Sequence, residues 1–133
     1  MPPKAIFPPG SEGTSTRLAL SPGILSHGHL FVTGMTGSDR QGIMPPDPQT
    51  QFRQAFEKIG AVLAEAGLDF HAIVEMTSYH VGLRAHFDLF NAVRQTYLHD
   101  PFPAWTAVEV AGLRREGALV EIRVIAATPE ALA

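Results

Sequence analysis

The chain has 133 residues, a formal net charge of −3 at pH 7 and no cysteine, and 17% of its residues are charged. This length predicts a single domain spanning residues 1–133, the negative charge argues against nucleic acid as a partner, and the lack of cysteine excludes thiol catalysis, disulfides and thiolate metal sites. Because soluble domains usually carry about 25% charged residues, the low charged fraction indicates neutral surface that subunit contacts would cover.

The N-terminal segment is rich in proline, glycine, serine and threonine, and it predicts an irregular arm over residues 1–16. It lacks the basic start and continuous apolar core of a signal peptide, and no segment of the chain approaches the roughly 20 apolar residues of a membrane span. We therefore expect a cytoplasmic protein that does not bind a membrane.

The next segment predicts strands followed by a helix. Residues 17–34 alternate short apolar runs with turn residues, with Ser26–His29 at the tip of a hairpin, and the proline-rich segment 37–48 predicts a loop. Asp47 followed by Pro48 indicates a helix start, because Asp caps free backbone N–H groups and proline at the first helical position has no N–H to leave unpaired.

This helix is predicted to continue to Ala66 and to end at Gly67. Gly60 inside it indicates close packing against a neighbouring element. Apolar residues recur at spacings of three and four and predict one stripe that faces a sheet: Phe52, Phe56, Ile59 and Leu63.

The second half of the chain predicts a strand over residues 73–83 and a helix over residues 87–98. Two further strands, Trp105–Val110 and Leu119–Ile125, flank a polar turn and read as a strand pair. The order of strands, helix, strand, helix and strands predicts an α+β fold in which two helices cover one face of a mixed β-sheet.

Several segments occur together in an order typical of one protein family. They are Leu20-Ser-Pro-Gly23, Leu30-Phe-Val-Thr-Gly34, Gln51-Phe-Arg-Gln-Ala-Phe-Glu-Lys-Ile59, Phe87 to Tyr97, and Pro103-Ala-Trp-Thr-Ala-Val-Glu-Val-Ala-Gly-Leu113 followed by Gly117-Ala-Leu-Val-Glu-Ile122. The chain resembles the RidA family (YjgF, liver perchloric-acid-soluble protein) from about Ser21 to Thr128. This resemblance implies a chorismate-mutase-like, RidA-like fold, a homotrimer with a central barrel, and ligand sites in the clefts between subunits.

The resemblance also implies a set of site residues. Glu121 would be the catalytic residue, because the family's glutamate at this place positions or activates the water that attacks an imine carbon. Residue type alone favours a solvent-facing strand glutamate instead. Besides Trp105, two pocket positions depart from the family, which has tyrosine at Leu20 and often cysteine at Ala107. The substrate pocket implied in this way consists of Leu20, Ser21, Gly34, Asn91, Trp105, Thr106 and Ala107.

Trp105 stands where the family usually has the arginine that binds the substrate carboxylate. An indole offers one N–H and a large apolar face in place of a planar fork of donors, which suits an aromatic, unsaturated or cationic ligand. Alternatively, Trp105 fills an abandoned pocket. A third possibility is that another arginine takes over the missing role, and the candidates are Arg17, Arg114 and Arg115.

The resemblance to the RidA family implies three candidate functions. The first is an enamine or imine deaminase that needs no cofactor, has altered or reduced activity on 2-imino acids, and acts on an unsaturated or aromatic acid of the 2-aminomuconate type. The second is a non-catalytic ligand-binding or stress-protective protein on the same scaffold, and the third, endoribonuclease activity, is disfavoured by the charge. The six histidines lack the spacing of metal ligands, so no metal site is expected.

Overall fold

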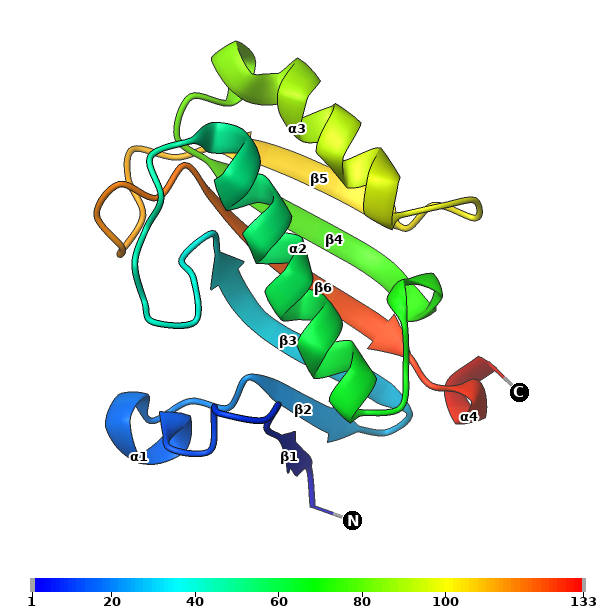
Figure 1. Ribbon diagram of the computed structural model, residues 1–133. Helices are drawn as coiled ribbons and strands as arrows, with labels where there is room; N and C mark the ends of the chain where they lie inside the picture. The colour runs from blue at the N-terminus through cyan, green and yellow to red at the C-terminus, as the bar shows by residue number, and fades with distance from the viewer. Residues whose placement is uncertain (1, 133) are drawn as a thin grey trace.

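Six strands form one sheet in the computed structural model, which describes residues 2–132 (Figure 1). The strands are β1 (Lys4–Ile6), β2 (Gly23–Ser26), β3 (His29–Thr36), β4 (Ile73–His80), β5 (Ala104–Glu109) and β6 (Val120–Ala127). Their order across the sheet is β1-β2-β3-β6-β4-β5. Only β4 and β5 run parallel, and the other neighbours are antiparallel.

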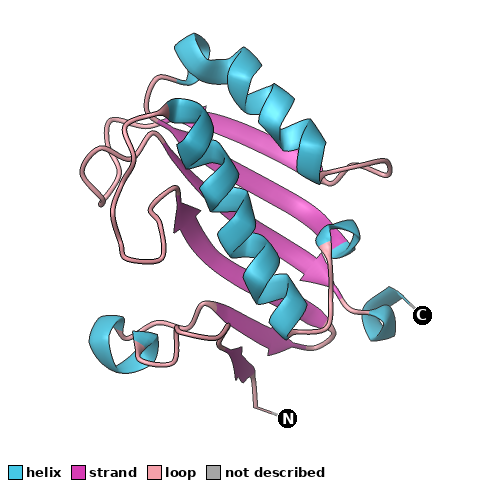
Figure 2. Ribbon diagram, viewed as in Figure 1, coloured by secondary structure: helices cyan, strands magenta, loops and turns pink. Residues whose placement is uncertain are grey.

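Two long helices, α2 (Pro48–Glu65) and α3 (Leu83–Tyr97), lie on the same face of this sheet (Figures 1 and 2). The shorter helices α1 (Thr14–Leu18) and α4 (Pro129–Leu132) lie near the two ends of the chain, and the 3-10 helix η1 (Phe70–Ala72) leads into β4. The predicted α+β fold with helices on one face is confirmed. Within residues 2–132, no helix is long and apolar enough to cross a bilayer.

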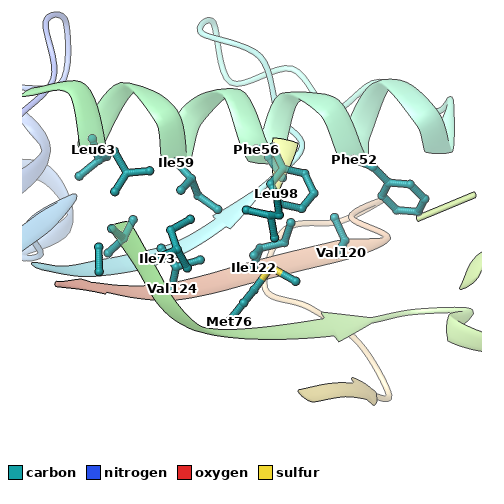
Figure 3. Packing of buried hydrophobic residues seen from close by; sticks show 14 of the residues in the cluster. Phe52, Phe56, Ile59, Leu63, Ile73, Met76, Leu98, Val120, Ile122 and Val124 are labelled. Carbon is teal, nitrogen blue, oxygen red and sulfur yellow. The ribbon is translucent and has the colours of Figure 1, made fainter. Parts of the chain in front are cut away.

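Helix α2 forms where the sequence predicts it. The side chain of Asp47 accepts a hydrogen bond from the backbone N–H of Thr50 at 2.9 Å and so caps the helix. At Gly60, an added Cβ would lie 3.0 Å from Cζ of Phe70, which confirms the predicted close packing. The predicted apolar stripe is fully buried and points toward the sheet in Figure 3: Phe52, Phe56, Ile59 and Leu63.

The central strand β6 shows which face of the sheet belongs to the core. Its residues alternate, so that four of them are buried: Val120, Ile122, Val124 and Ala126. Figure 3 shows the first three of these beneath α2. The residues between them, including Glu121 and Arg123, point to the opposite face. That face carries neither α2 nor α3 (Figure 1).

Two expectations about strands were wrong. The N-terminal segment is not irregular throughout, because Lys4–Ile6 pairs with β2 as an edge strand and α1 begins at Thr14, although residues 7–13 form no helix or strand. Strands β5 and β6 are not a pair either. Helix α3 carries the chain over the sheet and returns it beside β4, so β5 runs parallel to β4, and β6 then enters between β3 and β4.

Helix α3 begins four residues before the predicted start at Phe87, and a distant side chain explains the difference. The carboxylate of Glu109, at the end of β5, accepts hydrogen bonds from the backbone N–H groups of Gly82 and Leu83 at 3.1 and 2.6 Å. These contacts satisfy donors at the helix N-terminus that no local side chain caps. The start of α3 therefore depends on tertiary structure.

Candidate functional site

Glu121 and Gly34, two of the predicted site residues, touch on the sheet face that carries no helix. In the strand register, Glu121 of β6 lies opposite Thr36 of β3 and Tyr79 of β4. Gly34 lies in β3 where the register with β6 is irregular. A Cβ at this position would lie 2.9 Å from Cδ of Glu121 and closer still to Oε2. The carboxylate therefore occupies space that any side chain at position 34 would need.

The Glu121 side chain is half-buried, and its carboxylate forms no hydrogen bond or ion pair with any other residue between 2 and 132. A carboxylate without an internal partner is able to accept a proton from water or to orient it. Strand alternation and the contact with Gly34 place this group on the open face rather than in the core.

Trp105 lies on the other face of the sheet, beneath α3. In the register of β5 with β4 it is opposite Met76, which is fully buried. The indole stacks on Phe87, with 5.8 Å between ring centroids and 8° between ring planes, and its centroid is 6.0 Å from that of Phe90. Its N–H donates to Oγ of Ser78 at 2.9 Å. The indole donor is therefore engaged within the chain and is not free for a ligand.

Two buried polar side chains of β4, Ser78 and His80, hold Trp105 in place. Oγ of Ser78, which accepts the indole N–H, also lies 2.8 Å from Nε2 of His80. The His80 ring packs edge-on against Phe90 at 4.7 Å between centroids. Burial lowers the pKa of His80 to about 4, so this imidazole is neutral at neutral pH.

Arg94 of α3 covers the indole, and it was not among the predicted site residues. Its Cζ lies 4.3 Å from the Trp105 ring centroid and 5.9 Å from that of Phe102. Oδ1 of Asn91, one helical turn earlier, accepts from Nε and Nη2 of Arg94 at 3.0 and 2.8 Å. Asn91, a predicted pocket residue, thus acts by orienting an arginine. Helical spacing places Asn91 and Arg94 on one face, but it does not tell which strand that face meets.

The other predicted pocket residues are spread over two regions. Leu20 is exposed and Ser21 is half-buried, and both lie in the segment between α1 and β2. On β5, Ala107 shares the helix-covered side with Trp105 and lies opposite Ser78, whereas Thr106 is exposed on the other side, opposite Thr77.

The three arginines that the sequence offered as replacements do not reach Trp105 within the chain. Arg17 is exposed on α1 and Arg114 is exposed in the loop before β6. Arg115 donates from Nη2 to the backbone carbonyl of Gly42. The cation that contacts the indole is instead Arg94.

One chain does not bring all these residues into one cleft. Glu121 and Trp105 lie on opposite faces of the sheet, and β4 separates their strands. Two hollows of about 300 and 290 Å³ lie elsewhere and include none of the predicted residues. The first is lined by Ser38, Asp39, Arg40, Gln54, Glu57, Lys58 and Ala61. Between residues 2 and 132, no group of three or more His, Asp or Glu side chains is placed to hold a metal ion.

Comparison with known proteins gives a consistent result. Residues 14–128 match the model of the family described as Endoribonuclease L-PSP. RutC family protein YjgH of Escherichia coli (strain K12) is 39% identical over 127 residues, which cover 95% of this chain and 95% of that protein. A solved structure of protein YJGH has a TM-score of 0.86 at 38% identity and covers 95% and 96% of the two chains. The 2-iminobutanoate/2-iminopropanoate deaminase of Mus musculus is 31% identical over 99 residues, which cover 73% of this chain and 72% of that protein.

Proposed function

Because the chain belongs to the RidA/YjgF family, described as Endoribonuclease L-PSP, we propose that it binds a small imine or enamine acid between subunits and hydrolyses it to a carbonyl compound and ammonia. The observation that carries this proposal is the carboxylate of Glu121, which lies against Gly34 on the open face and has no internal partner. The likeness to a mouse protein named as an imine deaminase supports the reaction class.

In the proposed reaction, Glu121 acts as a general base and then as a general acid. Its carboxylate accepts a proton from a water molecule as the water oxygen attacks the carbon of the protonated imine, which gives a neutral carbinolamine. The carboxyl then passes this proton to nitrogen, and the carboxylate so formed takes the hydroxyl proton as the C–N bond breaks, the C=O bond forms and ammonia leaves; solvent takes up the last proton. An enamine first takes a proton from solvent at carbon to become the protonated imine. No cofactor takes part.

The proposed cleft lies between subunits of a homotrimer, because a single chain separates the candidate residues. The open face also leaves apolar side chains uncovered, such as the cross-strand pair of Phe31 and Ile125, and Phe31 is 41% exposed. Exposed apolar surface of this kind is typical of contacts between subunits. Light scattering should therefore give three times the chain mass of 14.4 kDa.

The proposed substrate is an unsaturated or aromatic acid rather than a short 2-imino acid. Trp105 occupies the place of the usual arginine and presents an aromatic ring there, and its N–H is engaged by Ser78. We expect wild-type protein to act poorly on 2-iminobutanoate, because position 105 offers no fork of donors to a small carboxylate. A conjugated chain would gain contacts with the aromatic side chains.

Replacement of Glu121 by glutamine tests the proposal. The amide keeps the size of the side chain but does not take a proton, so Glu121→Gln should lower ammonia release from any accepted imine or enamine by about a hundredfold or more. The matched control is Glu65→Gln, at an exposed position on α2, which should leave turnover unchanged. Light scattering and circular dichroism should show the same assembly and fold for all three proteins. Unchanged turnover of Glu121→Gln would assign Glu121 a structural role.

The internal engagement of Trp105 also favours a second candidate function, binding of a small acid without turnover on the same scaffold. Saturable binding of an unsaturated acid without ammonia release above the uncatalysed rate would support this alternative. RNA cleavage is not proposed, because the net charge of −3 provides little attraction for a phosphate backbone.

A further inference from the structure

We propose that Arg94 binds the carboxylate of the ligand, with Trp105 and Phe102 lining the space for the adjoining unsaturated chain. This inference rests on the proposed function in one respect, that the ligand is a small acid. Helix α3, which lies beside β5 in Figure 1, would thus supply the arginine that β5 lacks.

The hydrogen bonds of Arg94 leave a suitable pair of donors free. Asn91 Oδ1 accepts from Nε and Nη2, which lie on one side of the guanidinium group. The end of the group, formed by Nη1 and Nη2, keeps N–H donors in the parallel arrangement that matches the two oxygens of a carboxylate. Asn91 and the Trp105 ring together fix the plane of this fork before a ligand arrives.

The charge of Arg94 is also unmatched. No Asp or Glu side chain between residues 2 and 132 lies within ion-pair distance of its guanidinium group. Burial lowers the pKa of Arg94, which means that its surroundings disfavour the cation, although the group remains protonated at neutral pH. A half-buried cation that has aromatic contacts and no anion nearby is stabilised by a carboxylate that reaches it.

The aromatic side chains around Arg94 suggest the rest of the ligand. Phe102 is 53% exposed and Phe87 is 37% exposed, and both lie next to the Arg94–Trp105 stack. Exposed aromatic side chains beside a guanidinium fork suit a conjugated acid, whose π-system packs on them while its carboxylate binds the cation. A short aliphatic imino acid would leave most of this surface uncovered.

The position of Arg94 also constrains how such a ligand would meet Glu121. Arg94 and Trp105 lie on the helix-covered side of the sheet and Glu121 lies on the open side. A ligand held by Arg94 of one subunit would therefore meet the Glu121 of a second subunit. The site would be incomplete in a single chain.

Binding of sorbate, a conjugated dienoic acid, tests the inference directly. Trp105 is the only tryptophan in the chain, so its fluorescence reports events at this site without a label. Sorbyl alcohol is the matched ligand, since it has the same diene and no carboxylate. Wild-type protein should bind sorbate more tightly than the alcohol, and Arg94→Gln should weaken sorbate binding about tenfold or more while binding the alcohol as wild type does.

Two further variants serve as controls. Arg94→Lys keeps the positive charge and loses the fork, so its affinity for sorbate should fall between those of wild type and Arg94→Gln. Arg84→Gln removes an exposed arginine from the same helix and should bind sorbate as wild type does. Isothermal titration calorimetry should confirm each affinity. It is needed because the loss of Arg94 changes the environment of Trp105, and hence its fluorescence, even without a ligand. If Arg94→Gln does not fold, as judged by circular dichroism and light scattering, Arg94→Lys carries the comparison.

Three results would overturn the inference. Wild type could bind sorbate and sorbyl alcohol with equal affinity, or not bind sorbate at all. The third result is sorbate binding that is unchanged in Arg94→Gln or, if that variant does not fold, in Arg94→Lys. Failure of the inference is distinct from failure of the proposed hydrolysis. If ammonia release depends on Glu121 but sorbate binding ignores Arg94, the inference alone is wrong. If sorbate binding depends on Arg94 and persists in Glu121→Gln while no substrate releases ammonia, the hydrolysis is wrong and the inference stands.

Discussion

The two faces of the sheet hold the two parts of the candidate site in different ways. On the open face, Glu121 is positioned by strand register and by the space that Gly34 leaves, without a hydrogen bond to its carboxylate from the described chain. Beneath α3, Trp105 is fixed by aromatic packing, by Arg94 and by a hydrogen bond to Ser78. The difference teaches that substitutions on the open face should change activity with little cost in stability, whereas those beneath α3 should cost stability as well.

The largest expected effect is that of Phe90→Ala, which removes the ring linking Trp105 to the core. Phe90 is fully buried, and its centroid lies 5.2 Å from that of Phe52 and 4.7 Å from that of His80. Its loss should lower the free energy of unfolding by about 3–5 kcal/mol, because the cavity left behind cannot fully collapse. In the same urea titrations, Glu121→Gln should differ from wild type by less than about 0.5 kcal/mol. Similar costs for the two variants would remove the distinction between the faces.

A smaller effect is expected from the protonation of His80. Burial lowers the pKa of this side chain in the folded protein from its usual 6.5 to about 4, so the unfolded chain takes up the proton more readily. Neutral His80 therefore leaves the free energy of unfolding at its full value above pH 6.5, the pKa of this side chain in the unfolded chain. The free energy of unfolding should decline as the pH falls from about 6.5 to 4, by a total of about 3 kcal/mol.

Urea midpoints measured between pH 7 and pH 4 test this prediction. The curve for His80→Gln should be flatter over this interval than that of wild type, because the variant lacks the group that titrates. His71→Gln, at an exposed histidine, should follow the wild-type curve. Parallel curves for wild type and His80→Gln would show that His80 does not govern the acid sensitivity of this side of the sheet.

An effect on stability smaller than those of Phe90 and His80 is expected at Gly34. In Gly34→Ala the new Cβ would lie 2.9 Å from Cδ of Glu121, and the carboxylate would move because it is the end of a flexible side chain. The free energy of unfolding should change by less than about 1 kcal/mol. Ammonia release should fall by up to about a hundredfold, since a displacement of roughly 1 Å disrupts the alignment of a reacting group.

Gly112→Ala is the matched control for this substitution, because an added Cβ there meets no atom within 4 Å. This variant should retain both stability and turnover. Full activity in Gly34→Ala would show that the position of the Glu121 carboxylate against Gly34 is not required for the reaction. A large loss of stability would show that the open face is part of the core after all.

The sequence alone predicted the elements whose signals are local. Asp47 and Pro48 set the start of α2, and its apolar stripe repeats with the helical period over several turns. The period of β6 is a local pattern as well, and by it Glu121 lies on the face opposite that of Val120 and Ile122. The segments shared with the RidA family were sufficient to identify the family, which the comparisons confirm.

Only the tertiary structure decided which elements meet. The apolar runs that form β5 and β6 look like a hairpin in sequence, yet β6 pairs with β3 and β4 because long-range pairing, not chain proximity, completes the sheet. Arg94 likewise looks like an ordinary polar helix residue in the sequence. Its guanidinium group lies over the Trp105 ring only because α3 docks beside β5 (Figure 1). Helical and strand periods fix the face on which a side chain lies, whereas its partners are set by contacts between segments far apart in the chain.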